Sequence, residues 1–316
     1  MERIFGGDTV PHDLRGGVVA LGNFDGFHRG HQAVVGAVLA RARAEGRPAL
    51  VATFDPHPAQ LFRPDAPPFA LTRIDQRLDL FEGFGIDATV VLPFDRALAA
   101  ETAEGFARSW LADRIGAAAV FSGGDFTFGI KRSGDVAALR ELGSAHGFDA
   151  AVVEAVSDAG GTISSTRIRA LLQGGDPAGA AALLTRPYTI RGVVEHGNKL
   201  GRTLGFPTAN LDMGPYLRPA YGVYAVRVRR AGGTIHDGVA NLGVRPMIEP
   251  PKELLEAWLF DFDGDLYGET LDVELIAFLR AEAKLDGLDA LKAQVAKDAA
   301  AARAALNVDD SSGRSL

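Results

Sequence analysis

The chain has 316 residues, more than one hydrophobic core usually serves, so we expect two domains. The absence of cysteine excludes disulfides, thiolate metal sites and cysteine nucleophiles. The net charge of −7 argues against a nucleic-acid partner, which would need a basic face. No apolar run is long enough for a signal peptide or a membrane span, so we expect a cytoplasmic protein with no membrane partner.

The first half of the chain alternates short apolar runs with amphipathic stretches. The apolar runs predict strands at Gly17–Asn23, Ala49–Phe54, Ala88–Phe94, Ala117–Ser122 and Ala150–Val156. The amphipathic stretches predict helices at Gln32–Glu45, Arg73–Phe84, Ala103–Arg114 and Asp135–His146. This alternation indicates βαβ units and a parallel sheet, which binds ligands beyond the carboxyl ends of its strands. The loops after Asn23, Phe54 and Ser122 are therefore the candidate binding loops.

The pattern changes after the break Gly174-Gly175-Asp176-Pro177. Strand-like runs follow one another at Tyr188–Glu195, Gly222–Arg229, Thr234–Asn241, Leu255–Phe262 and Leu271–Phe278. We interpret Asp263-Gly264 as a hairpin turn between the last two runs, and Leu288–Leu306 as one long helix. The second half is therefore an antiparallel barrel or sandwich with a C-terminal helix. We place the domains at residues 1–184 and 185–316.

The segment Gly22–His31, with the sequence GNFDGFHRGH, joins the first predicted strand to the first helix. Glycines let the backbone approach a ligand, and a helix start offers N–H groups to phosphate. His28 and His31 lie three residues apart and can donate to the same phosphate oxygens, which is the charge stabilisation that adenylyl transfer needs. The alternative is a loop with two solvated histidines.

Three further segments accompany this loop. Ser165 and Thr166 suit a helix N-cap, and Arg169 follows in the first turns, where a bound phosphate would offset the unfavourable position of a cation. Two loops could hold a planar acceptor because they contain prolines or aromatic residues: Pro56-His57-Pro58, and Gly123–Gly129 with Asp125. Taken singly, each of these segments could also be ordinary loop or cap chemistry.

The second half contains a glycine-rich turn, GRTLGFPTAN, that is not a Walker-type loop. Its Gly201, Arg202 and Gly205 could cradle phosphates, or form a simple hairpin. Thr208 and Asn210 would face one side of an extended chain, and their oxygen atoms suit Mg²⁺. Glu256 interrupts an apolar run and is either a surface carboxylate or, if it points inward, a general base for a substrate hydroxyl.

These strings together resemble a known family. HRGH and ISSTRIR are similar to the nucleotidyltransferase superfamily, and GNFDGFHRGH, TFDPHP and GGDFTFG resemble the FMN adenylyltransferase module of bacterial bifunctional riboflavin kinase/FAD synthetases. GRTLGFPTAN, YGVYAV, GVANLGVRP and LFDFDGDLYGE resemble the riboflavin kinase module of the same family. The resemblance implies a Rossmann-like nucleotidyltransferase sheet followed by a six-stranded antiparallel β-barrel with a C-terminal helix.

The resemblance also implies two reactions: phosphorylation of riboflavin by ATP to FMN, and transfer of AMP from ATP to FMN to give FAD. Mg²⁺ with ATP is the implied cofactor, held at Thr208 and Asn210, and Glu256 is the implied kinase base. The implied ATP ligands are Gly22, Asn23, Phe24, His28, Gly30, His31, Ser165, Thr166, Arg169, Gly201, Arg202 and Gly205. The implied flavin ligands are Pro56, His57, Pro58, Asp125 and Arg280.

Some positions depart from the family pattern: Phe27, Val244, Met247, Trp258, Ala281 and Leu285. Phe27 is a modest departure beside the histidines, whereas the other five concern the lining on the flavin side rather than the phosphate chemistry. Two alternatives stay open from the sequence. One is a riboflavin kinase with an inactive nucleotidyltransferase-like domain, and the other is a flavin-binding regulator without turnover. The sequence leaves the oligomeric state open.

Overall fold

The computed structural model describes residues 1–196, 205–245, 252–284 and 286–312. The chain forms two compact units. Unit 1 comprises Met1–Pro67 and Ile74–Ser164, and unit 2 comprises Pro68–Arg73 and Ser165–Leu316. The chain therefore crosses from one unit to the other after Pro67, after Arg73 and after Ser164. Within the described ranges, none of the helices has both the length and the apolarity needed to span a bilayer.

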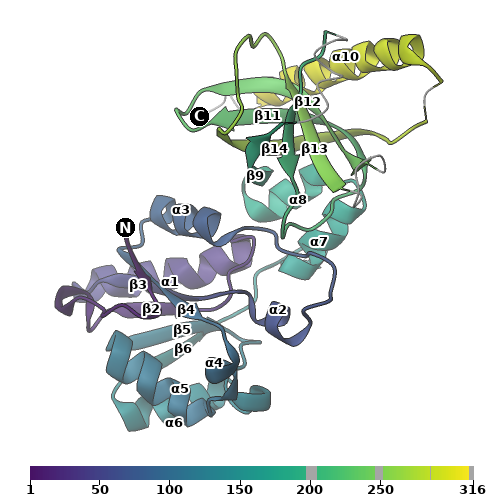
Figure 1. The fold of residues 1–316 in the computed structure, drawn as a ribbon. Coiled ribbons are helices and arrows are strands. Elements are labelled where there is room, and N and C mark those ends of the chain that lie inside the picture. The colour runs from purple at the N-terminus through teal and green to yellow at the C-terminus, as the bar shows by residue number, and fades with distance from the viewer. Residues whose placement is uncertain (197–204, 246–251, 285, 313–316) are drawn as a thin grey trace. The chain divides into compact units, whose positions relative to one another are not determined.

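Unit 1 is built on a six-stranded sheet in the order β1-β4-β3-β2-β5-β6, with every neighbouring pair parallel (Figure 1). The strands are β1 (Glu2–Phe5), β2 (Val18–Leu21), β3 (Ala49–Asp55), β4 (Ala88–Pro93), β5 (Ala119–Gly123) and β6 (Asp149–Val153). The predicted parallel sheet is confirmed. The edge strand β1 was not predicted, because Ile4 is its only buried residue and so it carries no apolar run.

Helices cover both faces of this sheet. They are α1 (Arg29–Glu45), α2 (Pro58–Phe62), α3 (Ile74–Phe84), α4 (Arg96–Ala100), α5 (Ala103–Phe106) with its π-helical continuation η2 (Ala107–Ile115), and α6 (Val136–His146), with short 3₁₀ turns η1 (His12–Leu14) and η3 (Ile130–Arg132) and a small hairpin, β7 (Ser157–Asp158) and β8 (Gly161–Thr162). The core formed by α1 and α3 takes in Val18 and Ala20, and the core formed by η2 and α6 takes in Val19 and Leu21. All four residues of β2 are therefore buried.

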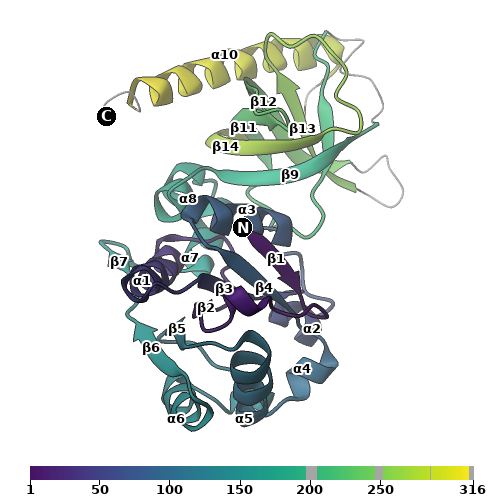
Figure 2. The same ribbon diagram turned by 90° about the vertical axis from the view of Figure 1, so that its left-hand side faces the viewer.

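Unit 2 contains a closed barrel in the strand order β10-β13-β12-β11-β14-β9, with β9 also paired to β10 (Figure 2). The strands are β9 (Tyr188–Glu195), β10 (Ala209–Asp212), β11 (Gly222–Arg230), β12 (Ile235–Arg245), β13 (Lys252–Leu259) and β14 (Thr270–Ala281). Every neighbouring pair is antiparallel, so the predicted six-stranded barrel is confirmed. The long helix α10 (Leu288–Ser312) packs against β11, β12 and β14.

The prediction of a hairpin at Asp263-Gly264 was wrong. β13 pairs with β10 and β12, whereas β14 pairs with β9 and β11. The segment between β13 and β14 therefore joins strands that are not neighbours. An Asp-Gly pair favours a local turn, but it does not determine which strands pair when a barrel closes.

Two helices and one inserted segment complete unit 2. Helix α7 (Ser165–Gln173) ends before Gly175, whose φ is 78°, and α8 (Pro177–Leu184) then packs against β9 and β14. The inserted segment is Pro68–Arg73, which we call the strap. Ala70 in the strap forms two backbone hydrogen bonds with the loop after β10, from its N to the Pro215 carbonyl at 3.1 Å and from the Leu217 N to its own carbonyl at 2.8 Å.

Candidate active sites

The three candidate loops of unit 1 lie at one edge of the sheet. Strand β2 is flanked by β3 on one side and β5 on the other, and all three run in the same direction. Their carboxyl ends therefore meet, and the loops that follow Leu21, Asp55 and Gly123 share that edge. This is the place where open parallel sheets bind ligands. The sequence-based placement of these loops is confirmed.

His28 and His31 form a stacked pair at the start of α1. Their ring centroids are 3.6 Å apart with an interplanar angle of 20°, and His28 caps the helix by accepting from the His31 backbone N at 3.4 Å through Nδ1. A neutral imidazole whose Nδ1 accepts carries its proton on Nε2, which can donate to an anion. A Cβ atom on Gly30 would lie 3.1 Å from the His28 Cε1 and 3.3 Å from the Ile163 carbonyl oxygen. The absence of a side chain at Gly30 therefore lets the His28 ring and the Ile163 carbonyl lie close to the backbone of α1.

The loop before this pair has an unusual backbone. Phe24 and Phe27 have positive φ values of 51° and 41°, a conformation that bulky residues rarely adopt. Both rings pack edge-on against Phe81 of α3, and Phe24 also packs edge-on against His31 at a centroid distance of 5.3 Å. Phe27, one of the departures from the family pattern, is therefore a buried core residue that contacts Phe84 as well. Packing from α3 holds the loop in its strained conformation.

The second predicted loop follows β3. His57 caps α2, because its Nδ1 accepts from the Ala59 backbone N at 3.1 Å. Phe62 at the end of α2 is 66% exposed, although it packs edge-on against Phe94. Burial raises the pKa of Asp55, and nearby Arg77 opposes that shift. The exposed ring of Phe62 extends the apolar surface next to Pro58, and sequence reasoning missed it.

The third predicted loop follows β5. It turns back at once, with the Phe126 backbone N donating to the Gly123 carbonyl at 3.2 Å, and it leaves Asp125 exposed. Phe126 stacks on Phe128 with an interplanar angle of 14°. Asp125 is therefore available to a ligand at the sheet edge.

Ser165, Thr166 and Arg169 lie on α7 in unit 2, where Ser165 begins the helix as predicted. The Arg169 Nε donates to the Phe69 carbonyl of the strap at 2.8 Å, and its guanidinium carbon lies 5.4 Å from the centre of the Phe69 ring. Both contacts fix the orientation of the arginine. Neither contact was predicted, because a hundred residues separate Phe69 from Arg169 in the sequence.

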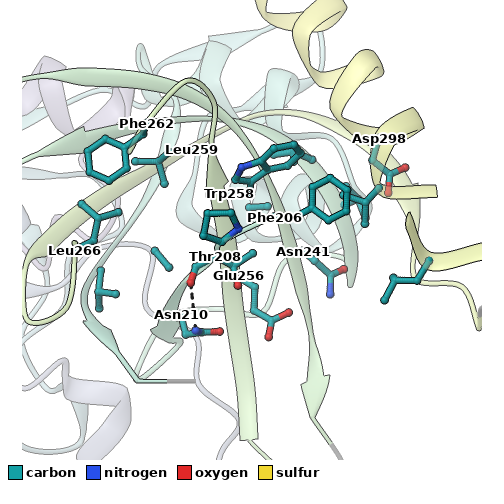
Figure 3. Close-up of a pocket in the computed structure, with 18 of the residues that line it drawn as sticks. Phe206, Thr208, Asn210, Asn241, Glu256, Trp258, Leu259, Phe262, Leu266 and Asp298 are labelled. Carbon is teal, nitrogen blue, oxygen red and sulfur yellow. Dashed lines mark hydrogen bonds between the residues drawn. The ribbon is translucent and has the colours of Figure 1, made fainter. Parts of the chain in front are cut away.

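The barrel of unit 2 holds a cavity of about 750 Å³ (Figure 3). Its wall includes the predicted residues Thr208, Asn210, Glu256 and Arg280. Asn210 on β10 lies opposite Glu256 on β13, and Asn241 on β12 lies opposite the same glutamate. The half-buried Glu256 therefore lines the cavity between two amides. Sequence reasoning missed Asn241, because only the strand register places it here.

One wall of the cavity comes from α10. The Arg280 guanidinium donates to both carboxylate oxygens of Asp298, from Nε at 2.8 Å and from Nη2 at 2.7 Å, and Gln294 Nε2 donates to the same carboxylate at 2.8 Å. The hydrogen bonding with Asp298 raises the pKa of Arg280. Trp258, another departure from the family pattern, lines the cavity and packs edge-on against Phe206 at 4.9 Å. Arg280 is therefore fixed by α10 at the cavity wall.

The side chains around Asn210 are suitable ligands for a hard cation such as Mg²⁺, whose other ligands would be phosphate oxygens and water. The Asn210 Nδ2 donates to the Thr208 carbonyl at 3.5 Å, so the two predicted ligands are neighbours in space. Both offer oxygen atoms, which Mg²⁺ prefers, and Glu256 places a negative charge across the strand. Gly205 has a φ of 88°, as expected for a glycine in a tight turn, whereas Gly201 and Arg202 lie outside the described residues.

A parallel sheet with a histidine pair at a helix start, followed by a barrel with a carboxylate and amide oxygens in its cavity, defines a two-site transferase that uses nucleotides. A family model described as FAD synthetase matches residues 10–167, and one described as riboflavin kinase matches residues 184–306. The chain belongs to the bifunctional riboflavin kinase/FMN adenylyltransferase family.

Two proteins that carry this family name match most of the chain, and a solved structure with a different description is similar over most of its length. The bifunctional riboflavin kinase/FMN adenylyltransferase of Escherichia coli K12 is 40% identical over 288 residues, covering 91% of this chain and 92% of that protein. The Haemophilus influenzae protein of the same name is 38% identical over 307 residues, covering 97% and 100%. A solved Streptococcus pneumoniae structure, described as a macrolide-efflux protein, has a TM-score of 0.83 at 31% identity and covers 94% of this chain and 97% of its own.

Proposed function

We propose that the chain makes FMN from riboflavin and ATP in the barrel, and FAD from FMN and a second ATP at the edge of the parallel sheet. One observation carries this proposal: each of the two family models matches a range of residues that contains one of the two candidate sites. The stacked pair His28 and His31 lies within residues 10–167, and the cavity around Glu256 lies within residues 184–306. We assign the two activities to residues 1–184 and 185–316, and both to the cytoplasm, which supplies ATP.

In adenylyl transfer, a phosphate oxygen of FMN attacks the α-phosphorus of ATP, and the bond to the pyrophosphate oxygen breaks. The protein has no covalent step to perform, so its task is to position the reactants and stabilise charge. His28 and His31 donate to the phosphates, together with the backbone of Gly22, Asn23, Phe24 and Gly30. Ser165, Thr166 and Arg169 bind the same nucleotide.

In the kinase reaction, Glu256 accepts the proton of the riboflavin 5′-hydroxyl as that oxygen attacks the γ-phosphorus of ATP and ADP leaves. Thr208 and Asn210 would hold Mg²⁺, which neutralises charge on the phosphate oxygens when bound. Gly201, Arg202 and Gly205 would cradle the nucleotide. The support for this arrangement is the strand register, which sets the proposed base and the proposed metal ligand opposite each other.

The flavin ring is held differently at the two sites. At the sheet edge, Pro56, His57 and Pro58 offer an apolar surface that continues into Phe62, and the exposed Asp125 offers a polar contact. In the barrel, Arg280 at the cavity wall contacts the flavin while Asp298 fixes its guanidinium.

A flavin time course tests the proposal. Purified protein is incubated with riboflavin, ATP and Mg²⁺, and the flavins are separated by chromatography at intervals. We expect FMN to rise first and FAD to follow. FMN without FAD would instead support a kinase with an inactive sheet domain, and unchanged riboflavin would support a flavin-binding regulator.

A further inference from the structure

A buried arginine lies beneath the two loops that we assign to nucleotide and flavin. Arg77 on α3 is 3% exposed, and a buried guanidinium is unfavourable unless its donors are used. Its Nη1 lies 2.7 Å from the Asn23 carbonyl oxygen, 3.2 Å from the Thr53 Oγ1 and 3.3 Å from the Phe54 carbonyl oxygen. Asn23 lies in the segment Gly22–His31, which we call the histidine loop. Phe54 lies near the end of β3, just before Pro56-His57-Pro58, which we call the proline loop. One guanidinium group therefore binds both segments.

Thr53 closes a ring of hydrogen bonds with Arg77 and the Asn23 carbonyl. Its hydroxyl accepts from Arg77 and donates to the Asn23 carbonyl at 3.1 Å. The carbonyl of Asn23 therefore receives two donors, one from α3 and one from β3. Thr53 is fully buried, so water does not compete for these hydrogen bonds.

Negative charge surrounds the same guanidinium. The Nη2 of Arg77 lies 3.6 Å from the Asp55 Oδ1, and Asp55 directly precedes the proline loop. Burial lowers the pKa of Arg77, whereas the charges of Asp25 and Asp55 raise it. An arginine keeps its proton in such a setting, so a permanent cation lies under the sheet edge.

The histidine loop needs an anchor of this kind. The residue after Asn23 is Phe24, with its φ of 51°, and non-glycine residues hold such conformations only where their surroundings enforce them. Phe81 packs against the ring of Phe24, and Arg77, one turn earlier on α3, binds the carbonyl just before it. Helix α3 therefore controls the loop through both contacts.

We infer that Arg77 is a positioning residue for adenylyl transfer, which acts through Asn23 and Phe54 by fixing the histidine loop relative to the proline loop. The inference rests on the proposed function of this sheet edge. The two reactants bind to different loops, so the distance from the FMN phosphate to the α-phosphorus of ATP depends on how rigidly those loops are joined. A displacement of about 1 Å can lower a rate by ~10²-fold.

The test measures kcat and KM of FAD formation from FMN in four variants: Arg77→Met, Arg77→Lys, Thr53→Val and Thr53→Ser. The exposed Arg43 provides the matched control Arg43→Met. Riboflavin kinase turnover and the thermal melt of each preparation report on folding. We expect Arg77→Met to lower kcat by ~10²-fold with KM values for ATP and FMN within about threefold of the parent. Kinase turnover should be unchanged.

The threonine pair keeps the test informative if Arg77→Met fails to fold. Thr53→Val should lower kcat by ~10-fold, whereas Thr53→Ser, which restores the hydroxyl, should recover it. Arg77→Lys keeps one donor and should fall between Arg77→Met and the parent. Arg43→Met should behave as the parent does.

Three results would overturn the inference. One is a folded Arg77→Met protein with normal kcat, another is a rise in KM alone, and the third is equal kcat values for Thr53→Val and Thr53→Ser. A parent protein that forms FMN but no FAD would instead overturn the proposed function of the sheet edge, and the inference with it. The parent assay therefore separates the two failures.

Discussion

Asn210 lies directly opposite Glu256 in the antiparallel register of β10 and β13. Opposite residues on such a pair share one face, with Cβ atoms about 5 Å apart. The proposed metal ligand and the proposed base are thus held by backbone pairing rather than by flexible loops. In the proposed reaction, the barrel would therefore fix the distance between the nucleotide phosphates and the hydroxyl that attacks them.

Glu256→Gln should abolish most kinase activity. The amide keeps the size of the side chain but cannot accept the proton, so FMN formation should fall by ~10²–10⁴-fold. FAD formation from supplied FMN should stay at the parental rate. Glu274→Gln is the matched control, since that glutamate lies on β14 and pairs with Arg229. Normal kinase turnover in Glu256→Gln would rule out a role as base.

Asn210→Ala should raise the Mg²⁺ requirement of the kinase. Loss of one oxygen ligand weakens the site, and we expect the Mg²⁺ concentration for half-maximal FMN formation to rise by ~10-fold or more. Asn210→Asp, which keeps an oxygen ligand, should need less Mg²⁺ than Asn210→Ala. A Mg²⁺ titration of each variant measures this. An unchanged titration for Asn210→Ala would place the metal elsewhere.

His31→Ala should stop FAD formation while FMN accumulates from riboflavin. Removal of one donor to the transition-state charge lowers kcat by ~10²–10³-fold. His12 is exposed on the same unit, so His12→Ala controls for the loss of an imidazole. Chromatography of the flavins measures both products in one reaction. FAD at the parental rate would show that His31 does not stabilise the phosphates.

The sequence predicted those parts of the sites that are local in the chain. The histidine pair depends on a spacing of three residues, and Glu256 stands out within an apolar strand, so both were identifiable. Arg77 was missed because its partners lie far away in the sequence, and an arginine on an amphipathic helix normally faces solvent. Asn241 was missed for a related reason, since only the pairing of β12 with β13 sets it opposite Glu256.

Glu253→Gln should destabilise the protein near neutral pH but not in acid. Burial raises the pKa of Glu253. The hydrogen bonds from Tyr221 and Arg218 lower it by more than burial raises it, so the pKa of Glu253 lies below its ordinary value. The stabilising contribution is therefore present above the unfolded pKa of about 4.3 and is lost as the pH falls through the native pKa. Thermal melts from pH 7 to pH 3 should show the two proteins converging.

Tyr221→Phe removes one of those hydrogen bonds and should give a smaller loss with the same pH trend. A difference between Glu253→Gln and the parent that stays constant with pH would show that the carboxylate is not stabilised in its charged form.

A C-terminal fragment that begins at Ser165 should melt at a higher temperature than one that begins at Arg186. The longer fragment keeps α8, whose buried Ala180, Leu183 and Leu184 cover part of the barrel unit, and each leucine contributes about 1.5–3 kcal/mol. Both fragments should phosphorylate riboflavin, and neither should make FAD because they lack His28 and His31. Equal melting temperatures would show that α8 adds nothing to the barrel unit.

The strap also imposes an order on biosynthesis. Ala70 leaves the ribosome 146 residues before its pairing partner Tyr216 (216 − 70), although both belong to unit 2. At roughly 5–20 residues per second, that interval lasts on the order of ten seconds. Synthesis of the unit 1 sheet, whose last strand ends at Val153, is completed within it, while the strap still lacks its backbone partners Pro215 and Leu217. The loop after β10 therefore pairs with a segment that was made long before it.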